Sequence, residues 1–199
     1  LIINALKSLI ISYNTDIERA TIQIAVCLLF SKQQVIVALS MYSTVEQFGR
    51  LDIVINNAGI NNEKNWEKTI EVNLVGTDIY SVLGLGCFAV ICADRVWTCS
   101  CVWQDASEQC DYGVRINALC PAFVDTQLLQ TVENEETMGK FVKFKDEFKQ
   151  RMDKYGVLKP SLIAEGMMRI ITDETLNGAV MKITCSKGIH FHTYEPLSA

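Results

Sequence analysis

Residues 48–59 read Phe-Gly-Arg-Leu-Asp-Ile-Val-Ile-Asn-Asn-Ala-Gly, and this stretch decides how the chain folds. Its centre, residues 51–55, is a short apolar run rich in β-branched side chains, which is typical of a buried strand. The polar residues and the glycine that follow predict a tight turn at the carboxyl end of that strand. We therefore expect a parallel strand that is covered on both faces.

Segments with helical and strand character alternate on the amino-terminal side of this strand and directly after it. Residues 22–30 fit either a buried strand or a short core helix, since periodicity does not separate the two. Residues 34–48 have a helical pattern that ends at Gly49. After the turn, the apolar residues Trp66, Ile70 and Leu74 fall on one face of an expected helix.

The same alternation continues in the carboxyl-terminal half. Residues 114–120 predict a strand that Pro121 stops, and residues 179–184 predict a last strand. Between them, an apolar stripe in a lysine-rich segment predicts an amphipathic helix closed by a glycine and a proline, and a further helix is expected over residues 161–172. The stripe consists of Phe141, Phe144, Phe148 and Met152, and the closing residues are Gly156 and Pro160. Strands separated by helices predict an α/β fold with a parallel sheet.

The composition describes one acidic globular domain. The 199 residues are 49% hydrophobic and 21% charged, and 18 Lys+Arg against 23 Asp+Glu give a net charge of −5. This balance argues against a nucleic-acid-binding protein, which needs a basic surface for phosphates. The longest apolar run, residues 79–93, is shorter than the about 20 residues of a spanning helix. No signal-peptide pattern is visible and the first residue is Leu1, so we expect a cytoplasmic fragment.

Eight cysteines are present, and five of them fall between residues 87 and 110. Cys99 and Cys101 form a single close pair, whereas structural zinc usually takes two such pairs. Without a secretory signal a disulfide scaffold is not favoured, so free thiols in a reducing cytosol are the simplest interpretation. A thiol or zinc site in the atypical Cys/Trp-rich insert, residues 91–111, stays open as a separate hypothesis.

Asn73 is the polar residue that needs an explanation on the expected helix. It stands beside Ile70 and Leu74 on the face assigned to the interior. A buried amide without hydrogen-bond partners costs about 1–3 kcal/mol. Asn73 is therefore either a satisfied structural asparagine or part of a site, and spacing alone favours the structural role.

Three of these segments resemble the short-chain dehydrogenase/reductase family. Residues 48–59 resemble its fourth strand, and Asn73 in Glu-Val-Asn-Leu resembles the asparagine of its active-site helix. Residues 113–126, Gly-Val-Arg-Ile-Asn-Ala-Leu-Cys-Pro-Ala-Phe-Val-Asp-Thr, resemble the sixth strand and the loop over the nicotinamide. Residues 61–69 and 177–191 are more specific, and resemble NAD-dependent members of the family that oxidise lipid alcohols.

The resemblance implies a Rossmann-like, doubly wound parallel sheet in a single domain, residues 1–199. The implied reaction oxidises a secondary alcohol of a hydrophobic hydroxy-lipid to a ketone, with hydride passing to NAD. Members of the family form homodimers. Asn73 would hold a water of the proton relay through its backbone. The residues expected near NAD are Asn57 at the ribose, with Val124, Asp125 and Thr126 along the nicotinamide and pyrophosphate.

The resemblance also implies that residues 127–155 cover the lipid chain. The apolar stripe in this segment agrees with that role. The same stripe fits equally well a helix that docks on the sheet without touching substrate.

The sequence departs from the family where the pyrophosphate would bind. Family members open with a Thr-Gly-x-x-x-Gly-x-Gly turn, but residues 1–50 contain one glycine, Gly49. Residues 1–47 are therefore interpreted as a degenerate amino-terminal part in which the first βαβ unit is incomplete. Leu28 stands where the family has an adenine-contacting aspartate, and Ala122 replaces a glycine in the loop over the nicotinamide.

The catalytic serine and the Tyr-x-x-x-Lys pair are not found between Asn73 and Gly113. About 40 residues stand where about 65 would be usual, so the fifth strand and its helix are not expected to fit. Tyr155 and Lys159 have the required spacing, but Gly156 between them predicts a turn. The sequence thus predicts a dehydrogenase that is inactive as written, or alternatively a catalytically empty remnant that binds lipid or another subunit.

Overall fold

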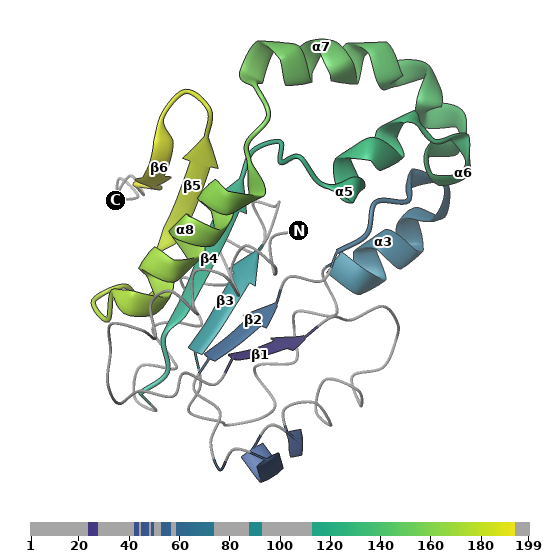
Figure 1. The fold of residues 1–199 in the computed structure, drawn as a ribbon. Coiled ribbons are helices and arrows are strands. Elements are labelled where there is room, and N and C mark those ends of the chain that lie inside the picture. Colours follow the sequence, from purple (N-terminus) through teal and green to yellow (C-terminus); the bar gives the residue numbers. More distant parts are fainter. Residues whose placement is uncertain are drawn as a thin grey trace, which may run out of the picture.

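The computed structural model describes residues 24–27, 42–43, 45–47, 49, 53–56, 59–73, 88–92 and 113–193. Six strands in this part of the chain form one sheet whose spatial order follows the sequence. The strands are β1 (Ile24–Cys27), β2 (Ile53–Asn56), β3 (Phe88–Cys92), β4 (Ile116–Pro121), β5 (Val180–Thr184) and β6 (Gly188–Phe191). Strands β1 to β5 are parallel and β6 is antiparallel to β5, so the expected incomplete α/β fold is confirmed (Figure 1).

The amino-terminal strands settle one alternative that periodicity left open. β1 is a strand, and it pairs with β2 in the parallel register Ile24 to Ile53. The apolar run after residue 50 forms β2, in which Ile53 and Ile55 are buried as expected. The helical residues 42–43 and 45–47 end at Gly49, whose N–H donates to the carbonyl of Val45 at 2.8 Å and whose φ is +77°.

β3 corrects the expectation that a fifth strand would not fit between Asn73 and Gly113. It lies between β2 and β4, pairing Ile53 with Phe88 on one side and Ala89 with Ile116 on the other. The expectation was wrong because it used average element lengths, and five residues, Phe88–Cys92, are enough to complete the pairing. The expected helix after this strand lies outside the described residues, as does most of the insert 91–111.

Residues 179–184 form β5, but β5 is not the last strand. The chain turns after Thr184 and returns as β6, where Lys182 pairs with His190. Gly188 has φ +63°, a conformation that glycine adopts without steric cost. β6 contains two polar or small residues in four positions, which is why its β-pattern is weak.

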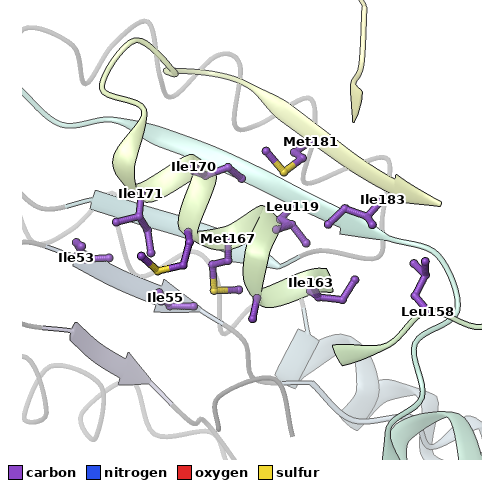
Figure 2. Close-up of a cluster of buried hydrophobic side chains, with 12 residues drawn as sticks. Ile53, Ile55, Leu119, Leu158, Ile163, Met167, Ile170, Ile171, Met181 and Ile183 are labelled. Atoms are coloured by element: carbon purple, nitrogen blue, oxygen red, sulfur yellow. The ribbon is translucent and has the colours of Figure 1, made fainter. Parts of the chain in front are cut away.

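Helix α8 (Pro160–Thr172) covers one face of the sheet and builds the core. Its apolar side meets β2, β4 and β5 in one cluster (Figure 2). Gly166 allows this close approach, since a Cβ there would lie 2.6 Å from Cδ1 of Ile183. The largest fully buried side chains of the described residues are Ile55, Leu119, Ile163, Met167, Ile170, Met181 and Ile183.

The remaining helices gather beyond the carboxyl end of the sheet, with α7 farthest from it (Figure 1). They are η1 (Glu63–Asn65), α3 (Trp66–Asn73), α5 (Gln127–Gln130), η4 (Thr131–Glu133), α6 (Glu135–Met138), η5 (Gly139–Phe144) and α7 (Lys145–Tyr155). The expected amphipathic helix around the apolar stripe is thus divided into η5 and α7. Neither part contains a fully buried residue.

The prediction that Trp66 and Ile70 lie on the inward face of α3 is wrong. Trp66 and Ile70 are 57% and 37% exposed, whereas Thr69 and Val72 are buried. Polar contacts turn the helix this way, because the hydroxyl of Thr69 exchanges hydrogen bonds with the backbone of Asn62. These contacts fix which side of α3 meets the turn before it.

Candidate functional site

The turn after β2 is held by the side chain of Asn73, the last residue of α3. Oδ1 of Asn73 accepts from the N–H of Ile60 at 2.9 Å, and Nδ2 donates to the carbonyl of Ile60 at 2.9 Å. One amide thus satisfies both backbone groups of one residue. Gly59 passes next to this contact, and a Cβ there would lie 3.7 Å from Oδ1 of Asn73.

The start of the helix adds a second set of contacts to the same turn. The carboxamide oxygen of Asn62 accepts from the N–H of Asn65 at 2.9 Å and caps η1. The N–H of Asn62 donates to Thr69 Oγ1 at 3.1 Å, and the same hydroxyl donates to the carbonyl of Asn62 at 3.0 Å. The side chains of Asn73 and Thr69, both in α3, therefore hold the backbone of Ile60 and Asn62, and the side chain of Asn62 ties this segment to the start of η1.

The loop after β4 is held by the backbone of Leu158, which lies between α7 and α8. The N–H of Leu158 donates to the carbonyl of Phe123 at 2.7 Å, and the N–H of Asp125 donates to the carbonyl of Leu158 at 3.0 Å. Val124 and Leu158 form an isolated parallel bridge. Asp125 is exposed, whereas Val124 and Thr126 are partly buried, and Thr126 is the N-cap residue of α5. Leu158 thus sets the path of the loop over residues 123–125.

A hydrogen bond joins the segment after β2 to the segment after β4. Nδ2 of Asn61 donates to Oγ1 of Thr131 at 2.9 Å, across 70 positions of the sequence. Thr131 in turn donates to the carbonyl of Leu128 at 2.7 Å, and Thr137 donates to the carbonyl of Thr131 at 2.7 Å. The turn after β2 and the segment after β4 therefore meet at the carboxyl edge of the sheet, where ligands of open α/β folds bind.

The structure places four of the five candidate site residues. Asn73 is engaged through its side chain as described above, and residues 124–126 lie in the loop after β4. Asn57 lies outside the described residues. Two structural contributors were missed from the sequence, Asn61 and Leu158. Asn61 carried no signal beyond its place after the turn, and Leu158 acts through its backbone, which no side-chain pattern reveals.

Tyr155 and Lys159 are separated by a turn, as expected. Tyr155 ends α7 and is 56% exposed, and Gly156 follows it with φ +79°. Lys159 is the N-cap residue of the next helix, α8. A lysine four residues after a tyrosine lies near the phenol only when both share one helix face. Tyr155 and Lys159 therefore do not share one helix, although they are four residues apart.

Within the described ranges, no group of three or more His, Cys, Asp or Glu side chains could hold a metal ion. Among the described helices, none is both long and apolar enough to span a bilayer. Cys120 is partly buried in β4 and Cys185 is exposed, and the other cysteines, apart from those in β1 and β3, fall outside the described part.

The sequence is similar to a known family and to named members of it. The pattern of the short chain dehydrogenase family matches residues 6–88. The Homo sapiens protein named 15-hydroxyprostaglandin dehydrogenase, NAD(+), is 42% identical over 179 residues, covering 76% of this chain and 67% of that protein. The Mus musculus protein of the same name is 42% identical over 181 residues, with coverages of 76% and 66%. The chain belongs to the short chain dehydrogenase family.

Solved structures of short chain dehydrogenases show the same fold. The 3-ketoacyl-(acyl-carrier-protein) reductase from Brucella melitensis, complexed with NADH, superposes with a TM-score of 0.60 at 19% identity, covering 76% of this chain and 73% of that chain. Carveol dehydrogenase from Mycobacterium avium, in complex with NAD, gives a TM-score of 0.57 at 19% identity, with coverages of 76% and 70%. The resemblance seen in residues 48–59, 61–69, 113–126 and 177–191 is confirmed, and the chain spans about two thirds of the length of its curated relatives.

Proposed function

We propose that this chain is a short chain dehydrogenase of the 15-hydroxyprostaglandin dehydrogenase type that has negligible dehydrogenase activity. The inherited reaction is oxidation of the secondary alcohol of a hydroxy-lipid, such as the 15-hydroxyl of a prostaglandin, to a ketone with NAD. The identity of 42% to proteins of that name supports the type of reaction. The reciprocal clamp between Asn73 and Ile60 carries the proposal, since it preserves the turn that would face the nucleotide.

The residues present fit NAD on one side only. Asn57 would approach the ribose, and residues 124–126 would line the nicotinamide side of the loop after β4. On the pyrophosphate side, β1 stands beside β2, the place of the first strand in a doubly wound sheet. The sequence offers no glycine-rich turn that would let backbone N–H groups reach a pyrophosphate, since residues 1–50 contain one glycine, Gly49. We therefore expect weak NAD binding.

The proton acceptor is the second missing part. Alcohol oxidation needs a base, and a tyrosine with a pKa of about 10 serves only when a nearby cation lowers it. Tyr155 ends its helix and Lys159 begins another element, so this pair does not supply such a base. The alignment with the Mus musculus relative also contains gaps in this chain, because 76% of 199 residues is about 151, whereas the alignment runs over 181 positions. About 30 aligned positions therefore have no residue in this chain.

The test is NADH formation by the purified chain with NAD and a prostaglandin bearing a 15-hydroxyl. The human relative, assayed alongside, serves as the positive control. We expect no NADH above the rate without protein. NADH formation that the Asn73→Ala variant abolishes would show that the chain is an active dehydrogenase and that the proposal is wrong.

A catalytically empty remnant that binds lipid or a full-length subunit is the second candidate. The exposed apolar side chains after β4 favour it, since large apolar surface on a domain usually meets a partner or ligand. They are Leu128, Phe141, Phe144, Tyr155 and Val157. Size-exclusion chromatography with a full-length relative distinguishes the two forms: a stable heteromer supports subunit pairing, and retention of a labelled hydroxy-lipid by the lone chain supports lipid binding.

A thiol or zinc site in the atypical insert, residues 91–111, is a third hypothesis. Metal analysis of the purified chain tests it directly. Zinc near one equivalent per chain would indicate a thiolate site made by cysteines of the insert. Substoichiometric zinc would leave free thiols, as the sequence suggests.

A further inference from the structure

Residues 139–155, comprising η5 and α7, form a basic–aromatic segment that the rest of the described chain leaves largely open. Phe144 and Tyr155 are 48% and 56% exposed, and Phe141 is 37% exposed. Phe148 connects the segment to the body of the protein, since its ring meets that of Phe123 edge-on at 5.2 Å between centroids. Figure 1 shows α7 at the outer side of the molecule, away from the sheet.

The charge of the basic–aromatic segment is opposite to that of the rest of the protein. It carries six basic residues against three acidic ones, a net charge of +3. The other residues hold 12 Lys+Arg against 20 Asp+Glu, which leaves −8. The basic residues are Lys140, Lys143, Lys145, Lys149, Arg151 and Lys154, and the acidic ones are Asp146, Glu147 and Asp153. An acidic chain has thus collected positive charge in η5 and α7 together.

Three lysines stand directly over the exposed rings. The ammonium of Lys140 lies 5.4 Å from the centroid of Phe141, that of Lys143 5.0 Å from Phe144, and that of Lys154 5.3 Å from Tyr155. Each pair thus presents an apolar body with a cation at its edge. Such side chains suit the boundary between acyl chains and headgroups, where rings enter the apolar layer and ammonium groups meet phosphates.

The acidic side chains of the segment all lie in α7, which contains Asp146, Glu147 and Asp153. η5 holds Lys140 and Lys143 with the exposed rings of Phe141 and Phe144, and no acidic residue. Glu133, outside the segment, is paired with Lys149 at 2.8 Å. The part of the segment with two exposed rings and two lysines is therefore free of acidic side chains.

We propose that the basic–aromatic segment docks the protein on the surface of a bilayer that contains anionic phospholipid. The charge and the ring–ammonium pairs carry the inference. A second copy of this chain fits the segment poorly, since two segments of +3 would repel at contact distance. The negative remainder does not prevent docking, because charges more than about 8 Å from the headgroups are largely screened at physiological salt. The proposal is independent of NAD binding and of any dehydrogenase activity.

The experiment is flotation of the full chain with vesicles of phosphatidylcholine, with or without phosphatidylserine. We expect binding to the vesicles with phosphatidylserine only, and release on raising the salt concentration. Each lysine near an anionic surface contributes about a fivefold change in binding. The Lys140→Gln/Lys143→Gln variant keeps both rings and should bind about 25-fold more weakly. A Phe141→Ser/Phe144→Ser variant should also bind more weakly, with its thermal midpoint measured to establish folding.

The matched control removes two exposed lysines elsewhere, Lys68→Gln/Lys187→Gln, with the same change in net charge. We expect this control to bind like the unmodified chain. Equal losses in control and test variants would attribute binding to net charge and overturn the proposal. So would equal binding to neutral vesicles, or no flotation of the unmodified chain. Self-association in the absence of vesicles that the Lys140→Gln/Lys143→Gln variant strengthens would instead identify the segment as a contact between copies.

Discussion

At the scale of the residue, Asn73 decides whether the turn after β2 keeps its shape. Its amide satisfies both backbone groups of Ile60 at 2.9 Å. We expect Asn73→Leu to lower the free energy of unfolding by about 1–3 kcal/mol, because the part-buried backbone groups lose their partner. Asn73→Asp keeps an acceptor for the N–H and should cost less. Urea unfolding of both variants measures this, and equal effects would contradict the reciprocal clamp.

Gly166 is the residue at which helix propensity and packing oppose each other. Alanine favours a helix interior over glycine by about 1 kcal/mol. A Cβ at position 166, however, would lie 2.6 Å from Cδ1 of Ile183 and 3.1 Å from the sulfur of Met181, both fully buried. Overpacking of a core costs about 1–3 kcal/mol, so Gly166→Ala should destabilise the protein overall.

The control for this prediction uses the atom that makes the closest contact. Ile183→Val removes Cδ1 and alone should cost about 0.5–1.5 kcal/mol. In the double variant the alanine has room, so its effect should be more favourable than in the unmodified core. Thermal unfolding of the four proteins gives the interaction energy, and strictly additive effects would show that the clash is relieved in another way.

Asp173 gives the structure a pH-dependent contact at the end of α8. The hydroxyl and the N–H of Thr175 donate to its carboxylate at 2.6 and 3.1 Å. These bonds hold the pKa of Asp173 below its ordinary value of 3.8. The contribution to stability is therefore present above that value and is lost as the pH falls through the folded pKa. Thr175→Val should raise the pKa of Asp173 toward 3.8, measured by an NMR titration of its carboxyl carbon; an unchanged pKa would contradict the assignment.

At the scale of the element, Arg115 closes the carboxyl-terminal end of α8. Its Nη1 donates to the carbonyls of Asp173 and Leu176 at 2.8 and 2.6 Å, and its Nη2 donates to that of Ile171 at 3.2 Å. Burial lowers the pKa of Arg115, while Glu174 and Asp173 raise it, and the guanidinium stays charged. A single side chain thus satisfies carbonyls that the helix leaves open.

We expect Arg115→Met to cost about 2–3 kcal/mol, since hydrogen bonds to charged groups contribute about 1.5–3 kcal/mol. Arg115→Lys keeps the charge but not the planar set of donors, so it should recover only part of this loss. Denaturant unfolding with hydrogen exchange at residues 170–176 measures both effects. Full recovery by lysine would show that charge, and not the geometry of the guanidinium, holds the helix end.

The elements that sequence predicted correctly share a strong local signal. β2 and β5 are runs of apolar, mostly β-branched residues, and α8 has an apolar face bounded by Pro160. β6 was missed because its local β-pattern is weak, and β3 was missed because average element lengths left no room for it, although its five residues are apolar. The face of α3 was misjudged because hydrogen bonds of Thr69 outweigh the burial of Trp66. Such contacts join residues that periodicity treats independently.

At the scale of the whole molecule, the turns at the carboxyl edge were predictable as motifs but not as an assembly. Residues 48–59 and 113–126 indicated the family, which the comparisons confirm. The bond between Asn61 and Thr131 joins residues 70 positions apart, and no pattern in one sequence reports such a pair. Leu158 likewise holds the loop after β4 through its backbone. The parts of the site that depend on long-range contacts therefore emerged only from the structure.

The bond between Asn61 and Thr131 makes the placement of residues 127–138 depend on the turn after β2. Asn61→Ala removes only this connection, because the hydroxyl of Thr131 keeps its bond to the carbonyl of Leu128. We expect faster amide exchange over residues 127–138 and a loss of about 1 kcal/mol in stability. Thr131→Ser retains the hydroxyl and should leave exchange unchanged. If Asn61→Ala lowers stability while exchange over residues 127–138 stays the same, the bond stabilises the turn alone, and the two regions at the sheet edge are not coupled.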